Sequence, residues 1–180
     1  NYTLPEELIA QHPAAERACS RLLCARRCGS GLQDRVFSDI IDLLDDSYFL
    51  VMNNTRVVPA RIPASKATGG KPELFFLEPA SEFRCKALLK GRFKPGDRIN
   101  VGGAPQGQPS GLSVTAVERL EDGCWLINSP VPVRGLMDAY GRIPLPPYIQ
   151  RDADSKDTER YQTVYAKEGA SVAAPTAGLH

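Results

Sequence analysis

Glycine and proline turns divide the middle of this chain into short segments, and this pattern constrains the fold more than any other feature. The turns lie at 68–70, 95–96, 102–103, 109–111 and 122–123. Between them are β-like runs at 74–77, 83–89, 98–101, 112–117 and 124–127. Several short strands with turns at this spacing are typical of a small barrel or sandwich. We therefore predict an all-β middle region.

The flanking regions have a mixed pattern. Residues 1–60 predict a short helix after Pro5, a strand at 20–25, a helix capped by Ser38 with Ile40, Ile41, Leu43 and Leu44 buried, and a buried strand at 48–52. Residues 133–180 predict a helix at 133–140, ended by Gly141, and a polar surface segment at 152–159. The predicted fold class is α+β or α/β. A partial α/β barrel-like domain, 1–60 and 133–180, is interrupted by an inserted antiparallel β-barrel domain at 61–132.

Charge and composition exclude several classes of protein. A net charge of +1 predicts no global attraction to nucleic acid, so any such contact must be local. The odd number of cysteines, with irregular spacing, predicts reduced thiols rather than a disulfide framework or a zinc site: Cys19, Cys24, Cys28, Cys85 and Cys124. No apolar run is long enough to cross a bilayer, and the polar start lacks a secretory signal. We expect a cytoplasmic monomer without a bound metal.

A polar string follows the strand expected at 48–52: Asn53, Asn54, Thr55 and Arg56. Polar residues at the end of a strand are well placed for a site in α/β sheets. Amides donate and accept hydrogen bonds, and arginine grips a carboxylate or phosphate with two bonds. The alternative is a turn stabilised by Asn and Thr side chains.

A run of basic residues lies between 84 and 98: Arg84, Lys86, Lys90, Arg92, Lys94 and Arg98. Only Asp97 opposes it, so the local sum is six minus one, or +5. In strand geometry Arg84 and Lys86 share one face, and such a surface could follow an RNA backbone. The alternative is an edge strand that lysines protect against aggregation.

Two later segments are also candidates. Prolines at 144, 146 and 147 form a rigid segment that presents Tyr148 and Arg151, either as the wall of a site or as a linker back to the first domain. Small residues dominate 169–180 and would let a ligand approach the backbone, with Thr176 and His180 as hydrogen-bonding groups. His180 could serve as an acid or base. The alternative is a structural terminal loop, and no Walker A pattern is present.

Taken in order, these strings resemble the S-adenosylmethionine:tRNA ribosyltransferase-isomerase family of queuosine biosynthesis. The matching strings are 4–10, 20–23, 53–57, 59–61, 66–71, 144–149 with Arg151, 161–166 and 173–180. They span almost the whole chain. Family chains continue well past the last string, so the resemblance implies that this chain is a fragment of the N-terminal half, and we expect it to be inactive alone.

The resemblance implies an enzyme that transfers and isomerises the ribosyl moiety of S-adenosylmethionine. The acceptor is 7-aminomethyl-7-deazaguanine in tRNA, the product is epoxyqueuosine, and S-adenosylmethionine is consumed as a substrate with no cofactor. Placed on the matching strings, the expected catalytic residues are His180, Thr176 and Arg56. The expected substrate-binding residues are Asn53, Asn54, Thr55, Tyr148, Arg151, Tyr161, Gln162 and Thr163. The expected RNA-binding residues are Arg84, Lys86, Lys90, Arg92 and Lys94.

This interpretation requires the 53–56 turn and the 175–180 tail to border a common cavity. The competing hypothesis is a β-barrel module that binds RNA without chemistry of its own. Such a module would have no need of the strings at 53–61 and 161–180.

Overall fold

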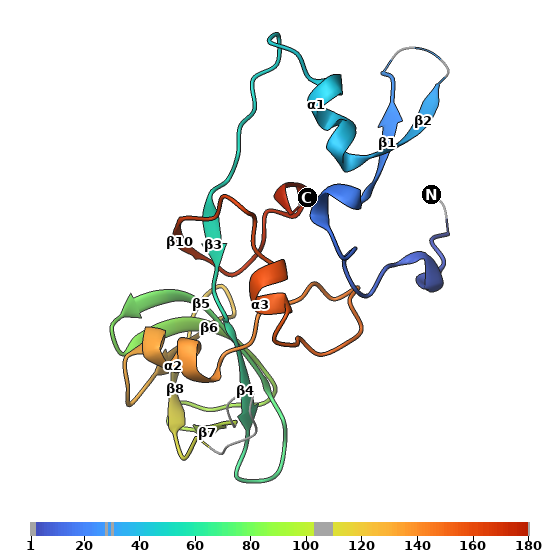
Figure 1. Cartoon of the computed structure of the whole chain (residues 1–180). Helices are drawn as coiled ribbons and strands as arrows, with labels where there is room; N and C mark the ends of the chain where they lie inside the picture. Colours follow the sequence, from blue (N-terminus) through green and yellow to red (C-terminus); the bar gives the residue numbers. More distant parts are fainter. Residues whose placement is uncertain (1–2, 28, 30, 103–109, 180) are drawn as a thin grey trace.

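The structure is a computed structural model that describes residues 3–27, 29, 31–102 and 110–179. Figure 1 shows an elongated molecule with a β-barrel at one end and a small hairpin with a helix at the other. Between them lie short elements from the first and last parts of the chain, and an extended connection at 44–54 leads from the hairpin end back to this middle region.

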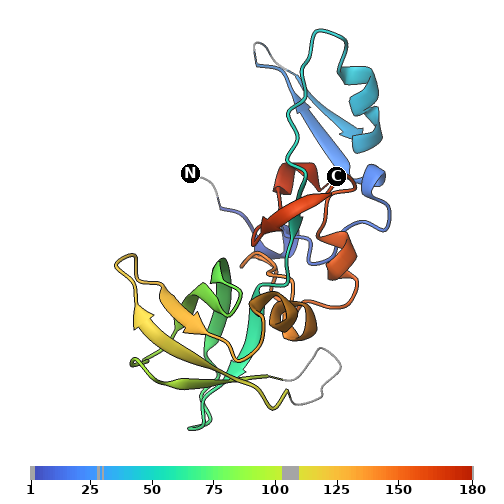
Figure 2. The same cartoon turned by 90° about the vertical axis from the view of Figure 1, so that its left-hand side faces the viewer.

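The barrel confirms the prediction for the middle of the chain. It is closed by antiparallel pairs in the order β4-β5-β6-β9-β8-β7, visible from a second side in Figure 2. The strands are β4 (Arg61–Ser65), β5 (Glu73–Ser81), β6 (Arg84–Lys90), β7 (Arg98–Val101), β8 (Ser113–Arg119) and β9 (Trp125–Asn128). Five of them match predicted runs. The sequence did not predict β4, because Pro63 interrupts a short segment that alone does not read as a strand.

Alternating apolar side chains fill the barrel. Along each strand every second residue points inward, as period-two geometry requires. The buried pairs are Leu74 and Phe76, Cys85 and Ala87, Ile99 and Val101, Val114 and Ala116, and Trp125 and Ile127. The helix α2 (Val133–Tyr140) confirms the prediction at 133–140 and packs Val133, Leu136 and Met137 against this same core.

Outside the barrel the elements are short. A hairpin of β1 (Arg21–Ala25) and β2 (Leu32–Val36) confirms the strand predicted at 20–25, and β3 (Thr55–Val57) pairs in parallel with β10 (Glu168–Ser171). The remaining elements are α1 (Ile40–Leu43), α3 (Asp157–Arg160) and 3-10 turns at Glu6–Leu8, Arg17–Cys19, Phe37–Asp39 and Thr176–Gly178. The α/β barrel-like organisation of this part stays a prediction.

Two predictions for residues 1–60 are wrong. The segment 48–52 forms no strand, and its apolar side chains face solvent, with Phe49 91% and Val51 87% exposed. A buried strand requires other elements that cover it, and among the described residues nothing covers the side chains of 48–52. The helix expected from Ser38 is reduced to a 3-10 turn and the single turn α1, and Ile41 is exposed rather than buried.

The cysteines that the structure describes are free: Cys19, Cys24, Cys85 and Cys124, while Cys28 lies outside the described residues. Burial raises the pKa of the Cys85 thiol to about 11, so it stays protonated in the barrel core. Among the described residues no helix combines the length and apolar character that a membrane crossing requires.

Candidate functional site

Two cavities in the middle of the molecule share part of their lining, which we call the shared wall. The first, of about 720 Å³, opens between this wall and the barrel, and we call it the barrel-side cavity. The second, of about 480 Å³, lies between the wall and the first twenty residues, and we call it the N-terminal cavity. Residues that line both cavities define the shared wall: Leu145, Pro146, Tyr148, Tyr161 and Thr176.

The barrel-side cavity brings together three distant parts of the chain. The barrel contributes a mostly apolar face with charges at Arg61, Glu73 and Lys90. The segment before the 175–180 tail contributes small residues at 172–174, which leave room near the backbone. The Arg61 guanidinium lies 3.2 Å from the Glu73 carboxylate, and both side chains are about half exposed. Small-molecule sites have this character, a largely apolar hollow with few polar groups.

The proline-rich segment is held rigidly against the barrel. Arg142 exchanges two backbone hydrogen bonds with Arg61 on β4, at 2.8 and 3.2 Å. Prolines at 144, 146 and 147 then fix the backbone with little further loss of entropy. Ile149 closes a turn by donating to the Pro146 carbonyl at 3.0 Å. The segment therefore holds Tyr148 in the lining that the two cavities share, and its role in the wall of a site stays a prediction.

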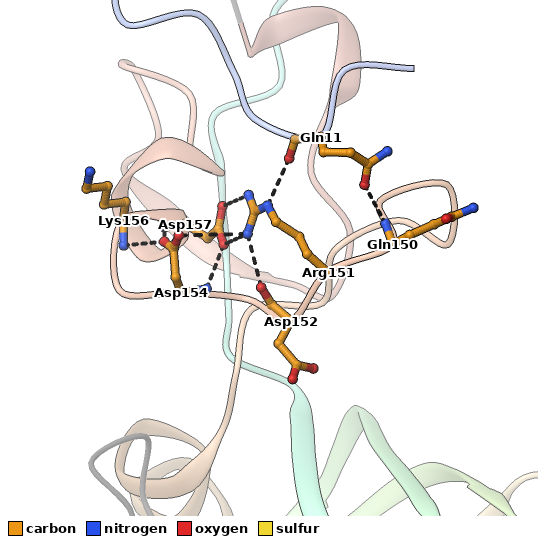
Figure 3. A network of polar contacts seen from close by, with 7 residues as sticks. All are labelled: Gln11, Gln150, Arg151, Asp152, Asp154, Lys156 and Asp157. Carbon is orange, nitrogen blue, oxygen red and sulfur yellow. Dashed lines mark hydrogen bonds and ion pairs between the residues drawn. The ribbon is translucent and has the colours of Figure 1, made fainter. Parts of the chain in front are cut away.

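Arg151 lines the N-terminal cavity and joins the segments on either side of it. Its guanidinium makes a two-pronged ion pair with the Asp157 carboxylate, at 2.6 and 2.8 Å, and its Nε donates to the Gln11 carbonyl at 2.8 Å (Figure 3). The Arg151 bond lowers the pKa of Asp157 despite burial, so the carboxylate stays charged. The prediction that 152–159 is a surface segment is wrong at Asp157, which is 4% exposed because it turns inward to this pair.

Gln11 ties the first residues to the same segment. Its side-chain amide donates to the Tyr148 carbonyl at 3.2 Å and accepts from the backbone N–H of Gln150 at 2.6 Å (Figure 3 shows the second bond). One amide thus satisfies a donor and an acceptor of the segment that carries Tyr148, and the next residue, His12, lines the N-terminal cavity.

The three residues of the string at 161–163 lie in different environments. Tyr161 lies in the shared wall. Burial raises the pKa of its hydroxyl, and the nearby Tyr148 raises it further by a smaller amount. Gln162 instead pins β3, because its side chain both accepts from and donates to the Val57 backbone at 2.8 Å. Thr163 is buried, and its hydroxyl has no hydrogen-bond partner within the described part of the chain.

The Asn53–Arg56 turn is close to the tail but not in either cavity. The Asn54 carbonyl accepts from the Lys167 N–H at 2.9 Å, and β3 pairs with β10 just beyond. Asn53 accepts from the backbone N–H of Thr55 at 2.8 Å, which is the turn-stabilising bond of the alternative interpretation. None of the residues 53–56 lines either cavity, so the expected common border of this turn and the 175–180 tail is not found in these two cavities. The turn meets instead the segment that precedes this tail, through the pairing of β3 with β10.

The tail enters the site through the turn Thr176–Gly178. Thr176 lines both cavities, and the Leu179 carbonyl accepts a 2.6 Å bond from Arg17. Gly178 packs so tightly on Tyr165 that a Cβ there would overlap the tyrosine hydroxyl, which accounts for glycine at this position. His180, the expected acid or base, lies outside the described residues.

The basic run lies on and beyond β6. Arg84, Lys86 and Lys90 alternate with the buried Cys85 and Ala87, so they share the outer face of the strand. Lys86 is paired with Asp122 at 2.6 Å, which neutralises it. Lys90 reaches the rim of the barrel-side cavity, and Arg92 and Lys94 are exposed in the turn that follows.

Several residues of the site were missed by the sequence interpretation. They are Gln11, Arg17, Arg61, Glu73 and Arg160. Each is isolated in the sequence and meets the site only through folding. For Arg61 a signal existed, since it ends the family string 59–61.

Comparisons with known proteins agree on a family. The family model described as "Queuosine biosynthesis protein" matches residues 1–180. A Pelobacter propionicus protein named S-adenosylmethionine:tRNA ribosyltransferase-isomerase is 42% identical over 186 residues, covering 100% of this chain and 52% of that protein. A Dichelobacter nodosus protein of the same name is 42% identical over 184 residues, covering 99% of this chain and 49% of that protein.

The chain therefore spans about half the length of the curated relatives it matches. Among solved structures, a crystal structure of an S-adenosylmethionine tRNA ribosyltransferase from Thermotoga maritima matches with 31% sequence identity and a TM-score of 0.39. That match covers 77% of this chain and 47% of the other.

Proposed function

Because the chain belongs to the queuosine biosynthesis protein family, we propose that it supplies about half of an S-adenosylmethionine:tRNA ribosyltransferase-isomerase. The reaction transfers the ribosyl moiety of S-adenosylmethionine to 7-aminomethyl-7-deazaguanine in a tRNA and isomerises it. Epoxyqueuosine forms, and adenine and methionine leave. S-adenosylmethionine is consumed, and no separate cofactor takes part. The protein acts as a cytoplasmic monomer, and the regions flanking the barrel belong to an α/β barrel-like domain.

The observation that carries this proposal is the pair of cavities with one shared wall. A two-substrate transfer needs both reactants held against each other in a fixed geometry. The barrel-side cavity has Lys90 of the basic run at its rim and takes the deazaguanine base of the tRNA. The N-terminal cavity takes S-adenosylmethionine. The ribosyl group crosses at the shared wall.

The wall suits the chemistry. The sulfonium of S-adenosylmethionine favours the face of an aromatic ring, and Tyr148 and Tyr161 supply two rings. Burial raises the pKa of Tyr161, so its hydroxyl is a protonated donor at neutral pH. Thr176 is a second hydroxyl in contact with both cavities. A base must also remove the proton that the sulfonium makes acidic, and His180 is assigned this role through the family string.

The remaining candidates act at a distance in this arrangement. Arg151 and Gln162 spend their hydrogen bonds on Asp157 and on the Val57 backbone, so they position the wall rather than touch substrate. Asn53, Asn54, Thr55, Arg56 and Thr163 lie beside the tail, and they orient it through β3 and its neighbours.

The tRNA contact follows the basic run. Lys90 lines the barrel-side cavity, and Arg92 and Lys94 are exposed in the turn that follows β6, whereas Lys86 is already paired with Asp122. Charges without an acidic partner gain most from phosphate, because their binding releases counterions. A β-barrel module that only binds RNA would use the same basic run. It would have no use for a second cavity that shares this wall.

The test is release of adenine. These 180 residues, within a full-length protein of the family, are incubated with S-adenosylmethionine and tRNA bearing the deazaguanine precursor. Adenine should appear only when both substrates are present. A folded full-length protein that binds the tRNA but releases no adenine would favour the RNA-binding module instead.

A further inference from the structure

Two arginines face the N-terminal cavity without a carboxylate partner. Arg17 comes from the turn Arg17–Cys19 and Arg160 from the end of α3, and both line this cavity. Neither forms an ion pair with any described acidic residue. Arg151 in the same cavity is different, because Asp157 neutralises it.

The two guanidinium groups are held in place by backbone carbonyls. Arg17 donates to Leu179 at 2.6 Å and to Glu159 and Arg160 at 3.2 Å, while Arg160 donates to Ala14 at 2.6 Å and Ala15 at 3.2 Å. Neutral carbonyls fix a guanidinium without cancelling its charge. Each guanidinium has five N–H groups, so at least two of Arg17 and three of Arg160 remain for another acceptor.

The pair therefore concentrates positive charge. Counting the cavity's lining with His12 neutral, three arginines and one aspartate give three minus one, or +2. Burial lowers the pKa of Arg17, and the charge of Arg160 lowers it further, while the nearby Glu159 offsets this in part. Two like charges brought together in a partly buried place favour binding of an anion, which removes their repulsion.

We propose that Arg17 and Arg160 together hold the carboxylate of the amino-acid part of S-adenosylmethionine. The inference rests on the proposed function and adds which residues recognise that end of the substrate. Arginine is suited to this role, since its planar fork matches the two oxygens of a carboxylate. With the carboxylate there, the sulfonium and ribose lie toward Tyr148 and Tyr161 in the shared wall.

A phosphate of the tRNA offers similar chemistry, but the cavity favours a small ligand. Its other lining residues include Leu145, Ile149 and Tyr161, which suit an adenine or the methylene groups of a small ligand and not a continuous phosphate backbone. The basic residues that reach open surface lie instead on β6 and its following turn.

The test compares two ligands that differ by one group. Binding of S-adenosylmethionine and of decarboxylated S-adenosylmethionine is measured by calorimetry with these 180 residues in a full-length protein of the family, and Arg160→Gln and Arg17→Gln are the variants. Arg134→Gln on the surface of α2, whose side chain is paired with Asp138, is the matched control. The unaltered chain and the control should bind the complete ligand about tenfold more tightly, the range expected for a charge-assisted contact. Either cavity variant should reduce this ratio to near one.

The ratio separates recognition from stability. If a variant merely loosens the fold, both ligands weaken together and the ratio persists, and that outcome would overturn the assignment. Equal binding of the two ligands by the unaltered chain would also overturn it, while leaving the proposed function intact. No binding of either ligand would count against the proposed function itself. A tRNA salt dependence that flattens in Arg160→Gln would show that the pair holds phosphate instead.

Discussion

The Arg151 guanidinium and the Asp157 carboxylate meet through two parallel hydrogen bonds, and this pair joins the proline-rich segment to α3. The same guanidinium reaches the Gln11 carbonyl, so three separate parts of the chain depend on it. The shared wall keeps its shape because its two halves, Tyr148 before the pair and Tyr161 after it, are tied together here.

Replacing Asp157 should therefore destabilise the chain. In Asp157→Asn the Arg151 charge loses its partner in a mostly buried place, and breaking such a pair costs about 3 kcal/mol. Urea unfolding monitored by the fluorescence of Trp125 measures the loss. Asp154→Asn, which changes a more exposed carboxylate of the same segment, should have a much smaller effect. Equal effects of the two changes would show that the pair contributes nothing particular.

The same pair predicts a dependence on pH. Because the folded pKa of Asp157 is lower than that of an unfolded aspartate, near 3.9, its contribution to stability is complete above that value. It is lost as the pH falls through the folded pKa. Below about pH 4 the unaltered chain should lose stability more steeply than Asp157→Asn as the pH falls. Unfolding curves at several pH values check this, and parallel slopes would contradict it.

Tyr161 offers a test of the shared wall. Tyr161→Ala should weaken binding of S-adenosylmethionine by about tenfold or more, because a stacked ring contributes about 1–3 kcal/mol. Tyr161→Phe keeps the ring and should bind nearly normally, while losing the proposed donor and hence turnover in a full-length protein. Calorimetry and adenine release measure the two effects separately. A phenylalanine variant that loses binding as fully as the alanine variant would remove the stacking role.

The residues of the basic run should contribute unequally to tRNA affinity. Replacing Lys90 and Arg92 with glutamine should lower the slope of log affinity against log salt by about one for each charge. Lys86→Gln is the matched control, since Asp122 already neutralises that lysine on the same face of β6. Titrations of tRNA at several salt concentrations give the slopes. If Lys86 matters as much as Lys90, the contact does not follow the rim of the cavity.

The exposed segment 48–52 should make the isolated chain associate. Phe49 and Val51 present large apolar side chains to solvent, and such patches promote association. Replacing both with serine should reduce dye binding and self-association in light scattering. Val164→Ser removes a single exposed apolar residue elsewhere and is the control. Unchanged association in the double variant would show that another apolar surface mediates it, for example on the β1–β2 hairpin.

Local sequence patterns predicted the barrel well, because its strands alternate and its turns contain glycine and proline. They failed at 48–52, where a run of five apolar residues was expected to be buried, since burial depends on partners that no local pattern contains. In the site, Tyr148 and Tyr161 were predicted through rigid or recognisable strings. Arg17, Arg160 and Glu73 were not, because each stands alone in the sequence and reaches its cavity only when distant segments fold together.

The placement of the substrate on the shared wall can be tested directly by a crystal structure, with S-adenosylmethionine, of a full-length protein of the family that contains these 180 residues. The ligand should occupy the N-terminal cavity, with its carboxylate on Arg17 and Arg160 and its ribose against Tyr148 and Tyr161. Density for the ligand in the barrel-side cavity alone, or on the outer surface, would contradict the account.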